Sequence, residues 1–356
     1  MRTVTHTLCN VAKTAIACVI ASAMAISLAA CGSQETKPKK TKTAEKPISV
    51  VSTIDTWGSL AKEIGGDDVK VTSILSGSDT DISSFKPNSK NSKDIQDAQV
   101  LLVNGAGYDD WITKIRPKNA EFISAASTVG ALNGDNPYLW FSNDARNAVA
   151  SAVTEALTRV KPDKRKVFND RLSQWQDREK KLEEYIKKFS KEHSSLQYAS
   201  TSSILFWLMS DIGLKDSTPK SYSDAINQGN LPDKSSIDEF QKLIEGRHID
   251  ILINDTQQSD DNYNRLVGIA GRSYTSTVSV SELMPSYAKS LDQWITKICD
   301  DMNNAANNTK TIREALAKDE DKKADSTDSQ EPITENPHPV EAGKPNSNKG
   351  QQDPGK

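Results

Sequence analysis

The chain has 356 residues, a formal net charge of −3 and four cysteines. A charge so close to neutral excludes the strongly basic surface that nucleic-acid binding needs, so no nucleic-acid partner is expected. When the apolar N-terminal end and the polar C-terminal end are set aside, the remaining chain is still long enough to form more than one lobe.

The first thirty residues have the composition of a secretion signal. Arg2 precedes an apolar run that covers residues 12–30, and a polar stretch follows it. We therefore assign residues 1–30 to a signal peptide, although the apolar run is also long enough for a membrane anchor. Cleavage would leave Cys31 and Cys299, and no intrachain disulfide is available if Cys31 carries a lipid.

Residues 28–32, with the sequence Leu-Ala-Ala-Cys-Gly, resemble the lipobox of bacterial lipoproteins. In that family the signal is cleaved before the cysteine, which becomes the lipid-bearing N-terminus. The resemblance implies that Cys31 attaches the protein to membrane lipid at the extracellular face of the cell membrane. The alternative is an ordinary export signal with an incidental cysteine. Residues 31–46 are mostly Lys, Thr, Ser and Glu, so we expect a flexible tether there.

Residues 47–141 alternate between β-branched apolar runs and segments with helical spacing, which predicts an N-terminal α/β lobe. The predicted strands are Ile48–Ile54, Val69–Leu75 and Val100–Val103, and the predicted helices are Thr56–Ile64, Ser89–Ala98 and Trp111–Ile115.

Residues 142–192 are predicted to form two linking helices. The first covers Asp144–Val160, and Pro162 starts the second because proline fits the first turn of a helix. The second helix, from Pro162 to Phe189, would be roughly 40 Å long and act as a rigid connection between two lobes. Its apolar residues lie on one face: Phe168, Leu172, Trp175, Leu182, Ile186 and Phe189.

Residues 193–317 repeat the alternation and are assigned to a C-terminal α/β lobe, whereas residues 318–356 are predicted to be a disordered tail from their polar composition. The predicted strands are Leu196–Ala199, Ile249–Ile253 and Tyr274–Val280, and the predicted helices are Ser203–Ile212, Ser235–Glu245, Asn262–Ala270 and Tyr287–Asn307.

Alternating strands and helices favour parallel pairing, so the fold class we predict is α/β, with two doubly wound lobes. Ligands of such sheets bind beyond the carboxyl ends of the strands. The segments at those ends are Asp55–Trp57, Ser76–Pro87, Asn104–Asp109, Ser200–Ser203, Asn254–Asp261 and Ser279–Glu282.

Four stretches resemble the solute-binding lipoproteins of zinc and manganese ABC importers: Ser52–Gly65, Asp81–Pro87, Gln96–Gly105 and Asn136–Trp140. The resemblance extends over residues 48–307. It implies two α/β lobes joined by one long helix, a ligand cleft between the lobes, and an ABC permease and its ATPase as partners. It also implies a monomeric binding protein and not an enzyme.

The resemblance implies four metal ligands, and this sequence keeps none of them. The two histidine positions of the family fall at Ser83 and Tyr138, and the third, a His or Glu, aligns with Ser202. The fourth, an Asp, is placed near Ser279 to within about two residues. Together with Asp81 and Asp255, these are the cleft residues we predict.

Histidine counting leads to the same conclusion without the family. Zinc sites are built mainly from His nitrogen and Cys sulfur. Beyond the signal the only histidines are His193, His248 and His338, and none is in a cleft segment. A histidine-rich zinc centre is therefore not expected.

Two kinds of ligand remain open. One is a divalent metal ion as cofactor, for which Asp79, Asp81, Asp255 and Glu282 could form a weak all-oxygen site. A small polar organic molecule could instead stack on Tyr138 or Trp57, although Tyr138 could simply fill the vacated space. The amides and hydroxyl that would hold the organic molecule are Asn104, Asn254, Thr256, Gln257 and Gln258.

Catalysis finds little support, because a serine nucleophile needs a neighbouring histidine and no cleft segment contains one. The function we predict is the solute-binding component of a zinc or manganese ABC importer with an atypical cleft. The alternative is a relative that binds no metal, and that binds a small polar ligand or acts as a surface adhesin or scaffold.

Overall fold

The structure is a computed structural model that describes residues 45–80, 82, 84–258 and 261–327. Every helix and strand described belongs to one compact unit that begins at Lys46. The predicted signal peptide and Cys31 lie outside the described residues, as does almost all of the predicted tether.

The N-terminal sheet has four parallel strands in the order β2-β1-β3-β4. Strand β4 was not predicted, because it has only four residues and includes Glu121. The strands are β1 (Ile48–Ile54), β2 (Val69–Leu75), β3 (Val100–Val103) and β4 (Glu121–Ser124), and the helices between and after them are α1 (Asp55–Gly65), α2 (Ser89–Gln96) and α3 (Ala125–Val129). Short 3-10 helices occupy Gly66–Asp68, Asp110–Lys114 and Leu139–Phe141, so the helix predicted at Trp111 is a 3-10 turn.

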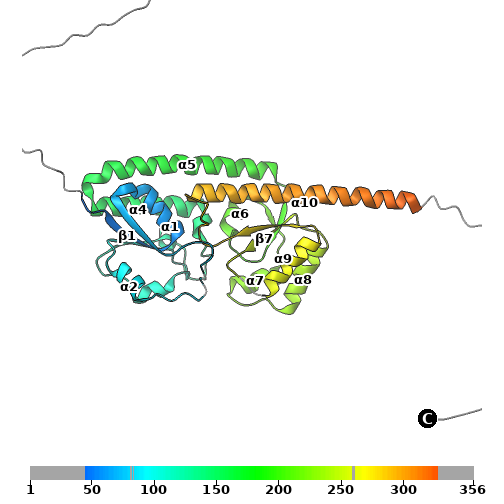
Figure 1. The fold of residues 1–356 in the computed structure, drawn as a ribbon, viewed down its shortest axis with the longest axis horizontal. Helices are drawn as coiled ribbons and strands as arrows, with labels where there is room; N and C mark the ends of the chain where they lie inside the picture. Colours follow the sequence, from blue (N-terminus) through cyan, green and yellow to red (C-terminus); the bar gives the residue numbers. More distant parts are fainter. Residues whose placement is uncertain (1–44, 81, 83, 259–260, 328–356) are drawn as a thin grey trace, which may run out of the picture. The chain divides into compact units, whose positions relative to one another are not determined.

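Two helices link the lobes, α4 (Asn143–Val160) and α5 (Arg165–Glu192). Residues Pro162–Lys164 form a 3-10 turn, so the long helix begins three residues after the predicted start. Helix α5 contacts α1 and α4 on one side of the molecule and α6 and α10 on the other, and it runs past both sheets (Figure 1). Its predicted stripe is buried except for Leu172, which is partly exposed. The prediction of one long connecting helix is therefore confirmed.

The C-terminal sheet repeats the topology, with four parallel strands in the order β6-β5-β7-β8. Strand β6 was not predicted because it has only two residues, both exposed. Helix α7 was also not predicted, although Tyr222, Ala225 and Ile226 lie at helical spacing. The strands are β5 (Gln197–Ser200), β6 (Lys215–Asp216), β7 (Ile251–Asp255) and β8 (Ser276–Val280), and the helices are α6 (Phe206–Ile212), α7 (Lys220–Asn227), α8 (Lys234–Glu245) and α9 (Asp261–Arg272).

Helix α10 (Leu291–Thr327) continues well past Asn307, where we expected it to end. Residues 318–327 are therefore helical, and the prediction of a disordered tail is wrong for them. Their Ala, Lys, Glu and Asp residues propagate a helix that is already nucleated by its buried first half, which contains Trp294 and Cys299. No helix in the described residues is long and apolar enough to cross a membrane.

One hydrophobic cluster continues from the N-terminal sheet through α4, α5 and α10 to the C-terminal sheet. Trp140, Phe168 and Trp294 are at most 1% exposed in this cluster. The same region buries an ion pair between Arg146 of α4 and Glu179 of α5. The shared core fixes the two sheets so that their carboxyl ends face a common region, where the polar loops meet.

Candidate ligand cleft between the two sheets

Loops from the two lobes are tied together by hydrogen bonds at the carboxyl ends of the strands. Asp55, at the start of α1, accepts hydrogen bonds from the backbone N–H of Gly77 at 2.7 Å and of Met284 at 3.1 Å. The side-chain amide of Gln257 donates to the carbonyl of Thr80 at 2.8 Å. The structure therefore brings together segments that the strand-end rule selected separately in each lobe.

Glu282 is the centre of this junction. Its carboxylate is 3% exposed and accepts a hydrogen bond from the Tyr108 hydroxyl at 2.9 Å, from the Tyr138 hydroxyl at 3.3 Å, and from the Gln258 amide at 2.9 Å. Its backbone N–H donates to Gln257 Oε1 at 2.6 Å. Tyr108 and Tyr138 belong to the N-terminal lobe, so Glu282 joins the lobes through its carboxylate.

Asp255, the last residue of β7, lies fully buried beside this group. Ser202 Oγ donates to its Oδ2 at 3.1 Å, and the backbone N–H of Gln257 donates to its Oδ1 at 3.0 Å. Burial, together with the neighbouring Glu282 carboxylate, raises the pKa of Asp255 from 3.8 to about 8. Asp255 therefore keeps its proton near neutral pH.

The two tyrosines remain protonated donors, because burial and the charge of Glu282 raise the pKa of Tyr108 and of Tyr138 well above 10. Each packs edge-on against Trp140, with ring centroids 5.3 Å and 5.5 Å from that of the tryptophan. Their orientation is therefore set by the core. We call Tyr108, Tyr138, Asp255 and Glu282 the carboxylate–tyrosine cluster.

The structure brings together Tyr138, Ser202, Asp255 and Glu282 of the predicted site residues. Ser279 does not join them, because it lies on β8 with an exposed side chain. Glu282, three residues later, is the member of that segment that reaches the cluster. Asp79 is also exposed and makes no recorded contact with the cluster. Asp81 and Ser83 lie outside the described residues.

Tyr108 is the cluster member that the sequence did not single out. It follows Gly105, Ala106 and Gly107, which all have positive φ angles, and its N–H donates to the Gly105 carbonyl at 3.1 Å. This tight turn is fixed by Asp109, a buried carboxylate that accepts from the N–H groups of Asn104 and Gly105 at 2.7 and 2.8 Å. The Gly-Ala-Gly-Tyr sequence was the available signal.

The amides predicted to hold an organic ligand have structural partners instead. Asn104 accepts from Trp57 Nε1 at 2.9 Å and donates to the Pro137 carbonyl at 2.8 Å. Gln257 connects Thr80 with the backbone of Glu282. Trp57 is fully buried, so no ligand can stack on it. These side chains therefore position the loops.

The donor set does not fit a histidine zinc centre. Among the described residues no group of three or more His, Cys, Asp and Glu side chains is placed to hold a metal ion. His193 packs on Phe189, with ring centroids 4.5 Å apart, and His248 is exposed. The cluster offers only oxygen atoms from two carboxylates and neighbouring hydroxyl groups, the ligand type preferred by hard cations.

A cavity of about 750 Å³ opens beside the cluster and contacts both lobes. Asn136, Pro137 and Tyr138 line it from the N-terminal lobe, while Ser202 and Gln258 line it from the C-terminal lobe. The chain has two α/β lobes, each with a parallel sheet, and one long helix connects them. A polar cleft lies where their strand ends face each other. This combination defines a two-lobe solute-binding protein of the rigid-helix type.

The chain belongs to the family described as zinc-uptake complex component A, periplasmic, which it matches over residues 50–305. This is a family of solute-binding components of metal uptake systems and not of enzymes. The resemblance drawn from the sequence is thereby confirmed.

The curated relatives are distant. The chain is 21% identical over 222 residues to the zinc-binding lipoprotein AdcA of Streptococcus pneumoniae, a match that covers 56% of this chain and 43% of the relative. It is 22% identical over 172 residues to the manganese-binding lipoprotein MntA of Halalkalibacterium halodurans, covering 46% of this chain and 55% of the relative. The chain thus spans only about half the length of the curated relatives it matches.

Solved structures show the same fold. The periplasmic zinc-binding protein TroA of Treponema pallidum superposes with a TM-score of 0.61 at 17% identity, covering 74% of this chain and 99% of the other. The laminin-binding adhesin Lmb of Streptococcus agalactiae, in a mutant form, superposes with a TM-score of 0.60 at 17% identity and the same coverage. Both have the two-lobe architecture predicted from the sequence.

Proposed function

We propose that this chain is the solute-binding component of an ABC importer of the zinc and manganese type, held at the extracellular face of the cell membrane by a lipid on Cys31. Its partners would be an ABC permease and its ATPase, and it would act as a monomer. The family match over residues 50–305 supports the transport role. The names of the AdcA and MntA relatives, both lipoproteins, support the anchor.

The cargo we propose is a divalent cation bound through oxygen, Mn²⁺ rather than Zn²⁺. The observation that carries this proposal is the pair of buried carboxylates, Asp255 and Glu282, which lie at the carboxyl ends of neighbouring strands of the C-terminal lobe and face the N-terminal lobe through Tyr138. Glu282 would provide negative charge, and Asp255 would do so once a bound cation displaces its proton, while Ser202 and the Gln258 side chain supply neutral oxygen atoms. Soft or borderline cations favour His and Cys, which are missing from the described cluster.

Addition of Mn²⁺ is expected to raise the melting temperature of the chain from Lys46 onward, and Zn²⁺ is expected to have the smaller effect. A ligand at 100 times its dissociation constant stabilises a folded protein by about 2.7 kcal/mol. The measurement is a thermal melt at increasing concentrations of each cation, with Ca²⁺ and Mg²⁺ for comparison. The variant Asp255→Ala with Glu282→Ala should lose the response, and Asp79→Ala, outside the cluster, should keep it.

The absence of any response to divalent cations would contradict the cargo proposal. It would instead support a second candidate function, a family relative that binds no metal, and that binds a small polar ligand or acts as a surface adhesin or scaffold. One observation favours this candidate: the Glu282 carboxylate already accepts three hydrogen bonds, from Tyr108, Tyr138 and Gln258, which a cation would have to displace in part.

The lipid anchor is tested separately. The variant Cys31→Ser is expected to leave the membrane fraction and appear in the medium, because a single thiol carries the proposed attachment. Immunoblots of the two fractions measure this, and Cys299→Ser is the matched control, since Cys299 is fully buried in α10. Retention of Cys31→Ser on membranes would rule out the anchor.

A further inference from the structure

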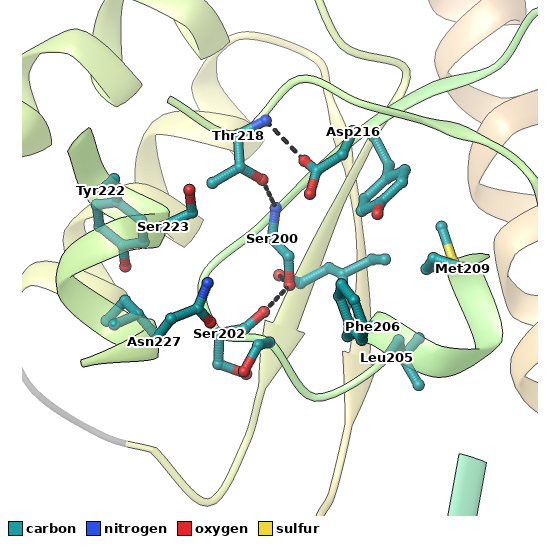
Figure 2. A pocket seen from close by; sticks show the side chains of 14 residues that line it. Ser200, Ser202, Leu205, Phe206, Met209, Asp216, Thr218, Tyr222, Ser223 and Asn227 are labelled. Carbon is teal, nitrogen blue, oxygen red and sulfur yellow. Dashed lines mark hydrogen bonds between the residues drawn. The ribbon is translucent and has the colours of Figure 1, made fainter. Parts of the chain in front are cut away.

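A second cavity lies within the C-terminal lobe, between helices α6 and α7. Its volume is about 130 Å³. In Figure 2, Tyr222, Ser223 and Asn227 of α7 lie on one side of it, Phe206 and Met209 of α6 lie on the other, and Ser200 and Ser202 lie between them. An apolar cavity of about 150 Å³ is large enough to bind benzene, so this one has the size of a single six-membered ring.

Apolar side chains form most of the wall. Leu205, Met209 and Tyr222 are at most 2% exposed, so they are held by the core and offer a preformed surface. Phe206, which also lines the cavity, is 51% exposed. A ring in the cavity would cover that exposed surface and gain hydrophobic contact with Phe206 and Met209.

The polar part of the cavity wall carries negative charge, from Asp216. Of the described residues that line the cavity, Asp216 is the only one with a formal charge. Its Oδ1 accepts from the Thr218 N–H at 2.8 Å, and the Tyr198 hydroxyl also bonds to the carboxylate. A carboxylate has about four acceptor positions, so Asp216 retains capacity for another donor. An anionic ligand would be repelled here, whereas an ammonium group would be attracted.

We propose that this cavity is a second ligand site, for a small primary amine that carries an apolar ring, an arylalkylamine. The ring occupies the space between α6 and α7, and the ammonium group donates to Asp216. The site adjoins the larger cavity of the cleft, since both are lined by Ser202, Ser203, Phe206, Ile226 and Asn227, and Ser202 also donates to Asp255. It uses neither carboxylate of the carboxylate–tyrosine cluster and does not depend on the cargo proposed above.

Three probes with the same ring separate shape from charge: phenethylamine, 2-phenylethanol and 3-phenylpropanoate. We expect saturable binding of phenethylamine to the purified protein in a chelating buffer, with 2-phenylethanol at least about tenfold weaker and 3-phenylpropanoate weakest. The measurement follows the methyl resonances of the methionines by NMR. Met209, which lines the cavity, should shift on titration, whereas Met302, buried in α10, should not.

Variants assign the contacts. Asp216→Asn is expected to lower the affinity for phenethylamine to that for 2-phenylethanol and to leave the affinity for the alcohol unchanged. Phe206→Ala is expected to lower the affinity for both. Asp224→Asn is the matched control, because Asp224 lies on α7 but pairs with Lys220 at the surface. Both Asp216 and Phe206 are exposed, so these variants should fold, and a thermal melt checks it.

The proposal is overturned if Met209 does not shift with either the amine or the alcohol, or if 3-phenylpropanoate binds as tightly as the amine. It is also overturned if Asp216→Asn leaves the preference for the amine intact. Because the titration uses no metal ion, its failure would leave the importer proposal untouched, and the failure of divalent cations to bind would leave this site untouched.

Discussion

Replacing Arg146 with alanine is expected to lower the free energy of unfolding by about 3–5 kcal/mol, because it leaves the charge of Glu179 buried and uncompensated. The two side chains are only 1% and 4% exposed. The guanidinium holds the Glu179 carboxylate through Nε at 3.1 and 3.0 Å and through Nη2 at 2.9 Å, and its Nη1 donates to the Trp140 carbonyl at 3.2 Å. The pair therefore joins α4 to α5 and supports the residue that orients the two cluster tyrosines.

Urea unfolding followed by circular dichroism measures this loss. The double variant Arg146→Met with Glu179→Leu is the informative control, since replacing a whole buried ion pair by apolar groups is often neutral. The double variant should lose clearly less free energy of unfolding than Arg146→Ala alone. Removing an exposed ion pair, such as that of Lys166 and Asp170 on α5, should lower the free energy of unfolding by less than about 1 kcal/mol. A loss below about 1 kcal/mol for Arg146→Ala would contradict the structural role.

The stability of the metal-free protein is expected to fall as the pH rises from about 4 to about 8, and Asp255 is the main reason. Its folded-state pKa is about 8, whereas an unfolded Asp titrates near 3.9. Between these values the folded state holds a proton that the unfolded state has lost. A rise in pH therefore favours unfolding, by up to about 1.4 kcal/mol per pH unit. Above about pH 8 this contribution has disappeared and the slope ends.

The variant Asp255→Asn should lose this slope, and it should be the more stable protein at pH 8. Glu63 contributes in the same direction, since burial raises its pKa from 4.5 to about 7 even though Arg178 opposes the shift. The quantity to compare is therefore the difference between variant and parent in chemical unfolding at several pH values. Parallel curves for the two proteins would show that Asp255 is not protonated in the folded state.

The fold was largely predictable, because its strands are rich in β-branched and apolar residues: β3 is a continuous buried run, and β2 alternates. The ranges predicted for β1, β2 and β3 agree with the structure. Strand β6 was missed because two exposed residues, Lys215 and Asp216, carry no apolar pattern and pair only because β5 lies next to them. The end of α10 was missed because the polar composition of residues 318–327, taken alone, is as typical of a disordered tail as of an exposed helix. Only the apolar first half of the helix favours its continuation through them.

The cleft was predictable as a place but not as a set of contacts. The rule for strand ends selected the segments that contain Tyr108, Asp255 and Glu282, and the family resemblance added Tyr138. The fourth family ligand was placed near Ser279 to within about two residues, and Glu282, three residues later, was predicted only as a weak oxygen ligand. Alternation along β8 turns Ser279 outward, and the chain then continues so that Glu282 meets the tyrosines of the other lobe. Such pairing across lobes depends on tertiary structure and leaves no local sequence pattern.

Anomalous X-ray scattering from crystals grown with Mn²⁺ is the most direct test of the central claim, that the cleft of this family member holds its cargo with carboxylate oxygens. The result we predict is a manganese peak within coordination distance of Asp255 and Glu282, with the hydrogen bonds from Tyr108 and Tyr138 to Glu282 lengthened or broken. A peak confined to His193 or His248, or no peak while all three hydrogen bonds to Glu282 remain in place, would contradict it.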